Sequence, residues 1–325
     1  MDEHQSALHS APIEPPRRRS KKKIIWASAA VIILLALAAC LAISIKVGLT
    51  LTQPAKKPIA LSPSEYGIEY KDIQFMSRDK ETGLSGWVLE PKEEAKMNLI
   101  FAHGYKGNRY EENIPFLPLA KQLTDRGYRI VLFDFRYAGN SEGEMTTVGA
   151  MEKYDLLGAV DWVKGEYKEP IGLYGISMGA STSILAASQT EDVIAVAADS
   201  PFSDLRDYLE ENMPVWTDLP NFPFTPLILA TIPVITDLDP AEASPINEIS
   251  KVSPRPILFI HNKGDGAIPY TESEKMAKVD KQAFSLWLTE GKGHVKSYEQ
   301  NKEEYVERVD AFFDKALLGQ KEKKS

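Results

Sequence analysis

Short apolar runs alternate with amphipathic stretches through most of this chain, and this alternation limits its possible folds more than any other feature. Two opening strands are predicted at about 67–77 and 83–90, joined by turn residues around 80–83. Six further apolar runs follow, at 98–102, 129–135, 171–176, 193–198, 256–260 and 284–288. Amphipathic stretches separate most of them, at 115–126, 148–167, 178–188, 271–279 and 297–318. Because short buried strands joined by helices pair in parallel, we expect an α/β fold. Its predominantly parallel sheet would have about eight strands, an antiparallel opening pair at one edge and helices on both faces.

One segment, residues 202–253, interrupts this alternation. Several prolines lie close together in it, among large apolar residues: Pro214, Pro220, Pro223, Pro226 and Pro233. An insertion of this length between two strands is typical of a cap or of part of a site. We therefore expect a mostly helical lid over about 202–253.

The N-terminal part contains an apolar run, Ile24–Ile45, of 22 residues without a charge. About 20 such residues are needed to cross the hydrocarbon core of a membrane. A buried helix of a soluble domain would show a polar face, and this run shows none. Six basic residues precede the run, whereas three lysines follow it closely. The positive-inside rule then predicts a single-pass helix in the cell membrane, with residues 1–23 in the cytoplasm and the large domain outside.

The predicted organisation follows from these boundaries. It consists of a basic cytoplasmic tail at 1–23, a transmembrane anchor at 24–45, a linker at 46–65, the α/β domain at 66–318 with its lid at about 202–253, and a charged C-terminal tail at 319–325.

Two other interpretations of the apolar run stay open. A cleaved secretory signal would have a shorter apolar core and a small-residue cleavage site, and no clear site follows here. The segment Leu37–Cys40 resembles the lipobox of bacterial lipoproteins, in which Cys40 would become the lipidated N-terminus. Against this, residues 41–45 remain apolar, as a spanning helix requires. Cys40 is also the one cysteine of the chain, so an intrachain disulfide is excluded.

Charge is distributed unevenly along the chain. The formal net charge is −8, and residues 1–23 carry six Lys/Arg against three Asp/Glu, so the rest of the chain carries −11. An acidic body argues against nucleic acid as a partner, because binding phosphates requires a basic face.

Two segments match the G-x-S-x-G pattern, in which glycines flank a serine on a very tight turn. One match surrounds Ser141 and the other surrounds Ser177. Ser177 directly follows the apolar run 171–176 and directly precedes a helix-forming segment, and this strand–turn–helix context is the one the pattern requires. Ser141 lies in a polar loop well beyond its strand. We therefore predict Ser177 as a nucleophile.

A serine nucleophile needs a general base, and a carboxylate must orient that base. After Ser177 the chain has two histidines, His261 and His294. His294 lies in a glycine-containing loop before the last helix, whereas His261 ends a strand, as a packed core residue would. Asp265 follows the same strand and precedes His294, in the usual order of serine, acid and histidine. We predict His294 as base and Asp265 as its orienting acid, with Asp199 as the alternative acid.

A tetrahedral oxyanion requires two preorganised N–H donors. One candidate is the backbone amide of Met178, directly after the predicted nucleophile. The other is the amide of Tyr105 in the loop His103–Asn108, where Gly104 lets the backbone approach closely. We expect His103 to support this loop.

These motifs together resemble the α/β-hydrolase superfamily, and more narrowly the bacterial membrane-anchored hydrolases described as esterases, lipases or prolyl-oligopeptidase-like. The resemblance spans about 66–318 and is carried by FAHGYKGN, DFRYAGNSEG, GLYGISMGAST, HNKGD and GKGH. It implies a triad of Ser177, Asp265 and His294, an oxyanion hole of the Tyr105 and Met178 amides, and no metal or cofactor. Tyr137 departs from the pattern, since many relatives have glycine there. A serine at the elbow argues against dehalogenase or epoxide hydrolase chemistry, which uses an aspartate.

The expected function is that of a membrane-anchored serine hydrolase that cleaves a carboxylic ester or related acyl bond through an acyl-enzyme on Ser177. Its expected partner is a small-molecule acyl or aryl ester substrate. Three alternatives remain: an acyltransferase, a serine peptidase with the same triad, and a non-catalytic scaffold that keeps the fold. The sequence does not predict the substrate or the oligomeric state.

Overall fold

The computed structural model describes residues 21–111 and 115–324 of the chain. It divides into two compact units, Met1–Ile43 and Ser44–Ser325. Most of the predicted basic tail therefore lies outside the described residues. In the first unit, the described residues belong to helix α1 (Lys21–Thr52), whose last residues, from Ser44 on, belong to the second unit.

The second unit is built on one sheet of eight strands in the order β1-β2-β4-β3-β5-β6-β7-β8. The strands are β1 (Tyr70–Met76), β2 (Gly83–Leu89), β3 (Met97–Ala102), β4 (Tyr128–Phe133), β5 (Ile171–Ile176), β6 (Val193–Asp199), β7 (Ile257–Gly264) and β8 (Phe284–Lys292). Pairs β1–β2 and β2–β4 are antiparallel, and the pairs from β4 through β8 are parallel. The predicted fold class is confirmed, including the antiparallel edge.

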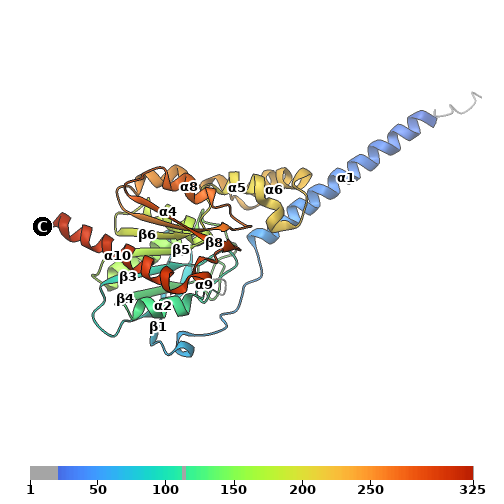
Figure 1. Cartoon of the computed structure of the whole chain (residues 1–325). Coiled ribbons are helices and arrows are strands. Elements are labelled where there is room, and N and C mark those ends of the chain that lie inside the picture. Colours follow the sequence, from blue (N-terminus) through green and yellow to red (C-terminus); the bar gives the residue numbers. More distant parts are fainter. Residues whose placement is uncertain (1–20, 112–114, 325) are drawn as a thin grey trace, which may run out of the picture. The chain divides into compact units, whose positions relative to one another are not determined.

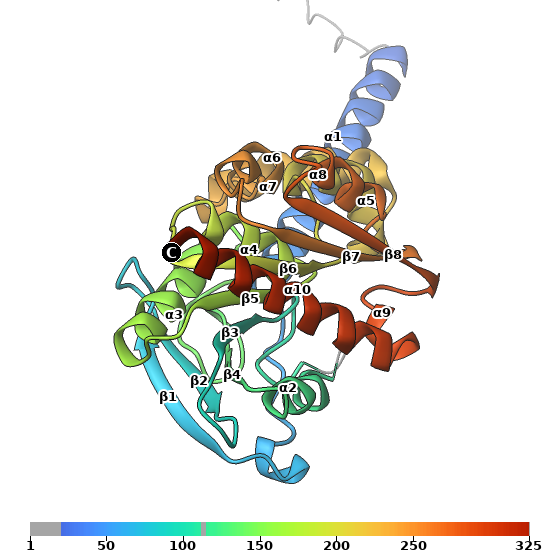
Figure 2. The same cartoon turned by 60° about the vertical axis from the view of Figure 1, so that its left-hand side comes forward.

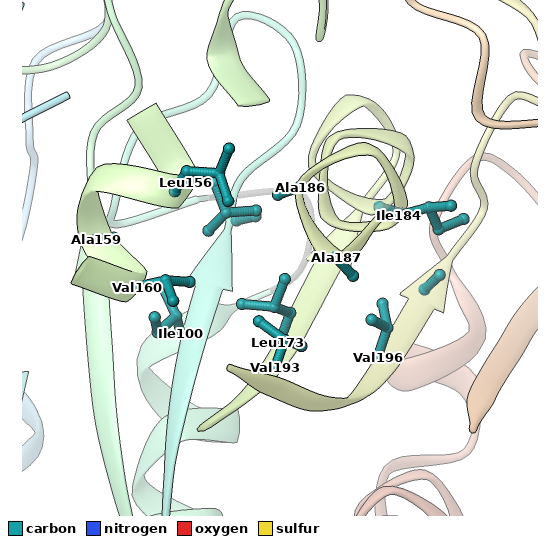
Figure 3. Close-up of a cluster of buried hydrophobic side chains, with 14 of the residues drawn as sticks. Ile100, Leu156, Ala159, Val160, Leu173, Ile184, Ala186, Ala187, Val193 and Val196 are labelled. Atoms are coloured by element: carbon teal, nitrogen blue, oxygen red, sulfur yellow. The ribbon is translucent and has the colours of Figure 1, made fainter. Parts of the chain in front are cut away.

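Helices cover both faces of this sheet (Figures 1 and 2). They are α2 (Phe116–Thr124), α3 (Glu152–Glu166), α4 (Met178–Ala187), α8 (Thr271–Ala277), α9 (Ser297–Gln300) and α10 (Lys302–Lys324). On one face α3 and α4 bury a cluster that includes Leu156, Ile184 and the strand residue Leu173 (Figure 3). On the other face α2 and α10 bury a second cluster that includes Leu119 and Phe313. Burying both faces explains why the parallel strands are apolar throughout.

Two strands extend further than the apolar runs indicate. β7 and β8 continue through polar residues, because backbone pairing persists as far as Gly264 opposite Lys292. Ladder hydrogen bonds do not depend on side-chain polarity, so the apolar pattern alone ends too early. This extension carries the end of β7 to the neighbourhood of Asp265.

The segment between β6 and β7 is mostly helical, as expected for the lid. It contains α5 (Leu205–Thr217), α6 (Asn221–Thr236), α7 (Pro245–Glu248) and the short 3-10 helices η2 (Pro240–Glu242) and η3 (Ile249–Lys251). Apolar residues of α5 and α6, among them Met213 and Ile228, form a third buried cluster with Phe202. This cluster lies outside the two clusters that cover the sheet.

Helix α1 ends at Thr52, whereas the sequence predicts a linker from residue 46. Pro54 explains the observed end, because the residue before a proline is disfavoured in helical conformation. Ser44, Gly48 and Thr52 are buried, and their spacing of four places them on one face of the helix. Residues 44–52 thus form part of the second unit. Another 3-10 helix, η1 (Pro63–Tyr66), precedes β1.

Candidate active site

Ser177 occupies a strained turn between β5 and α4. Its backbone angles are φ 50° and ψ −121°, a region that residues with a side chain rarely adopt. A Cβ on Gly175 would collide with the carbonyl of Gly179, and a Cβ on Gly179 would collide with the carbonyl of Ala102. Both flanking glycines are therefore sterically required, as the G-x-S-x-G pattern demands.

The three residues predicted as a triad form a hydrogen-bonded series with His294 in the middle. His294 Nε2 lies 2.8 Å from Ser177 Oγ, and His294 Nδ1 lies 2.7 Å from Asp265 Oδ2. Because a carboxylate only accepts, Nδ1 carries the proton and Nε2 is free to accept the hydroxyl proton of Ser177. The imidazole is 23% exposed, so it can be reached from outside. This is the geometry of a hydroxyl paired with an oriented base.

Asp265 is held by donors on several sides. Its Oδ1 accepts the backbone amides of Ala267 at 2.8 Å and Ile268 at 3.0 Å, and its side chain has no exposed surface. Burial acts to raise the pKa of Asp265, but the hydrogen bonds from His261 and His294 outweigh it and hold this pKa well below its usual range. The carboxylate therefore stays ionised beside His294.

His261 does not contact Ser177 but supports the acid. Its Nε2 donates to the carbonyl of Ile268 at 2.9 Å and lies 3.4 Å from Asp265 Oδ2, while its Nδ1 accepts from Ser273 Oγ at 2.7 Å. The carbonyl can only accept, which assigns the ring proton to Nε2. His261 is thus a buried positioning residue next to Asp265.

The alternative acid, Asp199, has other partners. It lies at the end of β6, fully buried, and accepts from Ser200 Oγ at 2.8 Å and from Tyr305 Oη at 2.8 Å. Burial raises its pKa to about 6, although the two hydroxyl hydrogen bonds act in the opposite direction. His294 Nδ1 donates its hydrogen bond to Asp265, so Asp199 is not the carboxylate that orients the His294 ring.

The loop after β3 lies against the elbow. A Cβ on Gly104 would be 3.5 Å from Ser177 Cβ, and the following residue, Tyr105, lines the same cavity as Ser177. The Met178 amide lies in the first turn of α4, where helix amides have no intrahelical acceptor. No backbone hydrogen bond from either amide occurs within residues 21–111 and 115–324. Both amides therefore remain available to bind an oxyanion.

Two buried side chains hold this loop. His103 Nδ1 donates to the carbonyl of Gly104 at 2.8 Å, and its Nε2 accepts the Phe135 amide at 3.0 Å. Glu111 accepts the Gly104 amide at 3.0 Å. The sequence suggests the role of His103 but not that of Glu111, since no motif marks an acid seven residues after the glycine.

The second match to the pattern has a structural role. Ser141 Oγ donates to the carbonyl of Asp134 at 2.6 Å and accepts the Ser85 amide at 3.0 Å. Both interactions connect its loop to the strands. Ser141 is buried and has no histidine partner among the described residues.

A cavity of about 760 Å³ leads to Ser177, and part of its space is open to solvent. Its wall also includes Tyr105 and Met178, and the lid contributes Trp216, whose ring packs edge-on against Tyr105 at 5.8 Å between centroids. Residues of α1 contribute to the wall as well, including Gly48. The sequence does not predict this contribution, because the linker was expected to start before it.

Comparison with known proteins supports the hydrolase architecture. The family described as X-Pro dipeptidyl-peptidase (S15 family) matches residues 44–232, more than half of the chain. The protein YqkD of Bacillus subtilis (strain 168) is 27% identical over 263 residues, which is 80% of each chain. The lysophosphatidylserine lipase ABHD12 of Danio rerio is 25% identical over 218 residues, covering 65% of this chain and 54% of the lipase.

Solved structures agree with this assignment. The esterase Pf2001 of Pyrococcus furiosus superposes with a TM-score of 0.68 and 27% identity, covering 82% of this chain and 99% of the esterase. The resemblance seen in the sequence motifs is therefore confirmed, and the chain belongs to the S15 family of the α/β-hydrolase superfamily, with esterases and lipases among its relatives.

Proposed function

We propose that this protein is a membrane-anchored serine hydrolase that cleaves carboxylic esters through an acyl-enzyme on Ser177. The observation that supports this most strongly is the unbroken hydrogen-bonded series from Ser177 through His294 to Asp265. A hydroxyl, an imidazole of defined tautomer and an ionised carboxylate are the three groups that acyl transfer by a serine requires.

The proposed reaction has two steps. His294 Nε2 takes the proton of Ser177 as Oγ attacks the ester carbonyl, and the resulting oxyanion is stabilised by the amides of Tyr105 and Met178. The imidazolium then gives its proton to the leaving alcohol, which leaves the acyl group on Ser177. A water molecule, deprotonated by His294, then attacks this acyl-enzyme. As the acid is released, the imidazolium returns the proton to Ser177 Oγ.

The cavity favours an ester over a peptide substrate. A dipeptidyl-peptidase must bind the free α-amino group of its substrate, and a carboxylate is the natural partner of that cation. No carboxylate lines the cavity within the part of the chain that the structure describes. Two similar proteins, an esterase of Pyrococcus furiosus and a lipase of Danio rerio, support the same choice.

Helix α1 supports membrane attachment, because it has the length and composition to cross a membrane. We propose an uncleaved anchor with residues 1–23 in the cytoplasm and the catalytic domain on the outer side, following the charge asymmetry around the helix. A lipidated Cys40 is the alternative, and both forms place the domain on the outer face. A protease added to intact cells would digest the domain in this topology and would spare it in the reverse one.

A fluorophosphonate label tests the enzyme hypothesis directly. We expect the full-length protein in detergent to be labelled, and Ser177→Ala to lose the label, because Ser177 lines the cavity and pairs with the partly exposed His294. Ser273 also donates to a histidine, His261, but both side chains are fully buried. The matched control is Ser141→Ala, which replaces the serine of the second G-x-S-x-G match. This variant should retain the label. Absence of labelling in folded wild-type protein would favour the scaffold. Product analysis with an added alcohol then separates hydrolysis from acyl transfer.

A further inference from the structure

The C-terminal end of α1 lines the same cavity as the elbow. Gly48, Leu51 and Thr52 belong to its wall, together with Ser177. Their position is held by hydrogen bonds outside the helix: Tyr105 Oη donates to the Leu51 carbonyl at 2.6 Å, and the Thr146 amide donates to the Thr52 carbonyl at 2.8 Å. The end of the anchor helix is therefore a built part of the cavity wall.

The polar side chains of this wall are occupied. Tyr105 Oη donates to the Leu51 carbonyl. Tyr208 Oη donates to the Ala267 carbonyl at 2.8 Å, and Thr52 Oγ1 donates to the Leu49 carbonyl at 3.1 Å. Ser177 Oγ faces His294. The rest of the lining is apolar apart from the glycine. Such a cavity accommodates hydrocarbon, since a polar group inside it would find few partners.

One contact determines how close the helix comes to the lid. A Cβ on Gly48 would lie 2.7 Å from Ile232 Cγ1 and closer still to Ile232 Cδ1, whereas Ile228 Cγ2 would be at 3.7 Å. Ile232 and Ile228 belong to α6 and line the cavity too. Any side chain at position 48 must therefore displace Ile232, and we expect the Ile232 side chain to move into the cavity that it lines.

The lid and the helix have few charged residues near Gly48. The stretch between Asp218 and Asp237, which contains α6, has none, and the uncharged run of α1 ends at Ile45, three residues before Gly48, with the exposed Lys46 as the one charge between them. Along a helix, three residues correspond to a rise of about 4.5 Å. Gly48 thus lies within one helical turn of the segment expected to lie in lipid.

We propose that Gly48, at the end of the anchor helix, is a specificity-determining residue that sets the length of linear acyl chain the cavity accepts. This inference rests on the proposed function. The substrate class is an ester of a long, unbranched fatty acid, whose chain lies between the end of α1 and α6 while its carbonyl lies at Ser177. Gly48 acts by leaving the space that the distal methylenes occupy.

A chain-length series tests this proposal. The full-length protein in detergent micelles is assayed with p-nitrophenyl butyrate, octanoate and dodecanoate, and kcat/KM for each ester is compared. In Gly48→Val we expect the dodecanoate-to-butyrate ratio to fall by about tenfold or more, in line with the cost of excluding a few methylenes from an apolar pocket. Thr50→Leu adds bulk on an exposed position of the same helix and should leave the ratio unchanged.

A complementary substitution separates pocket shape from misfolding. Adding Ile232→Ala to Gly48→Val removes the displaced side chain and should restore most of the ratio. Ile232→Ala alone should raise the ratio above that of the wild type, and this variant decides the case if Gly48→Val does not fold. An unchanged ratio in Gly48→Val or in Ile232→Ala, with normal labelling of Ser177, overturns the proposal. Absent labelling and absent hydrolysis in the wild type would instead overturn the proposed function, and this inference with it.

Discussion

Asp199 ends β6, and Asp265 directly follows the neighbouring parallel strand β7. Both side chains are buried, yet their environments shift the carboxyl pKa in opposite directions. Asp265 accepts hydrogen bonds from His294 and from two backbone amides, with His261 Nε2 3.4 Å away, and its pKa is held well below the usual range. Asp199 accepts hydrogen bonds from two neutral hydroxyl groups, and burial raises its pKa to about 6. Position in the sheet therefore does not decide which carboxylate remains ionised. The donors around it do.

The contrast between the two carboxylates predicts that activity depends on Asp265 and not on Asp199. In Asp265→Asn, the amide would present a donor to His294 Nδ1, which favours the wrong tautomer, so we expect kcat/KM for an ester to fall by about three to four orders of magnitude. Asp199→Asn is the matched control at the neighbouring strand and should retain most of its activity. Both variants are assayed at pH 8 with the same ester. A larger loss in Asp199→Asn than in Asp265→Asn would reverse the assignment.

Much of this site follows from local sequence. The elbow at Ser177 was predictable because its two glycines are required by collisions within a few residues, and the strand and helix around it are strongly patterned. The order of serine, acid and histidine then selected Asp265 and His294, and the structure brings these side chains together. Their catalytic roles remain predictions.

Other features depend on contacts between distant segments. Gly48 lines the cavity because α1 continues to Thr52 and meets the lid, although the apolar run ends at Ile45. Glu111 reaches the Gly104 amide through a loop conformation with φ 35°, which no motif encodes. The support of Asp265 by His261 depends on how β7 ends. Each of these contacts depends on how distant segments pack, which the hydrophobic periodicity of the sequence does not predict.

The raised pKa of Asp199 makes a separate prediction about stability. An aspartate with a pKa near 3.8 when unfolded and about 6 when folded binds its proton more tightly in the folded protein. Its contribution is fully present below about pH 4 and is lost as pH rises through 6. Asp199→Asn removes this loss, so relative to the wild type it should gain up to about 3 kcal/mol of unfolding free energy between pH 4 and pH 7.

Urea unfolding of both full-length proteins in micelles, followed by tryptophan fluorescence, measures this difference. The constant cost of the substitution cancels when the two pH values are compared. Asp265 has a lowered pKa, so its contribution to the unfolding free energy is lost as pH falls and not as it rises. Titration of Asp265 therefore does not account for the expected pH dependence. A stability difference that is independent of pH would mean that Asp199 is ionised throughout, and the contrast between the two carboxylates would disappear.

The smallest effect is expected at Ser273, which acts on Asp265 through His261. Ser273→Ala leaves Nδ1 of the buried His261 without its donor, at a cost of about 1–3 kcal/mol in unfolding free energy. The ring proton stays on Nε2, because a reversed tautomer would set a lone pair against the Ile268 carbonyl and Asp265. The interaction with Asp265 therefore survives, and kcat/KM should fall only slightly. A loss of activity approaching that of Asp265→Asn would show that the hydroxyl of Ser273, through His261, is what keeps Asp265 in place, and the two backbone amides would then be insufficient to hold it.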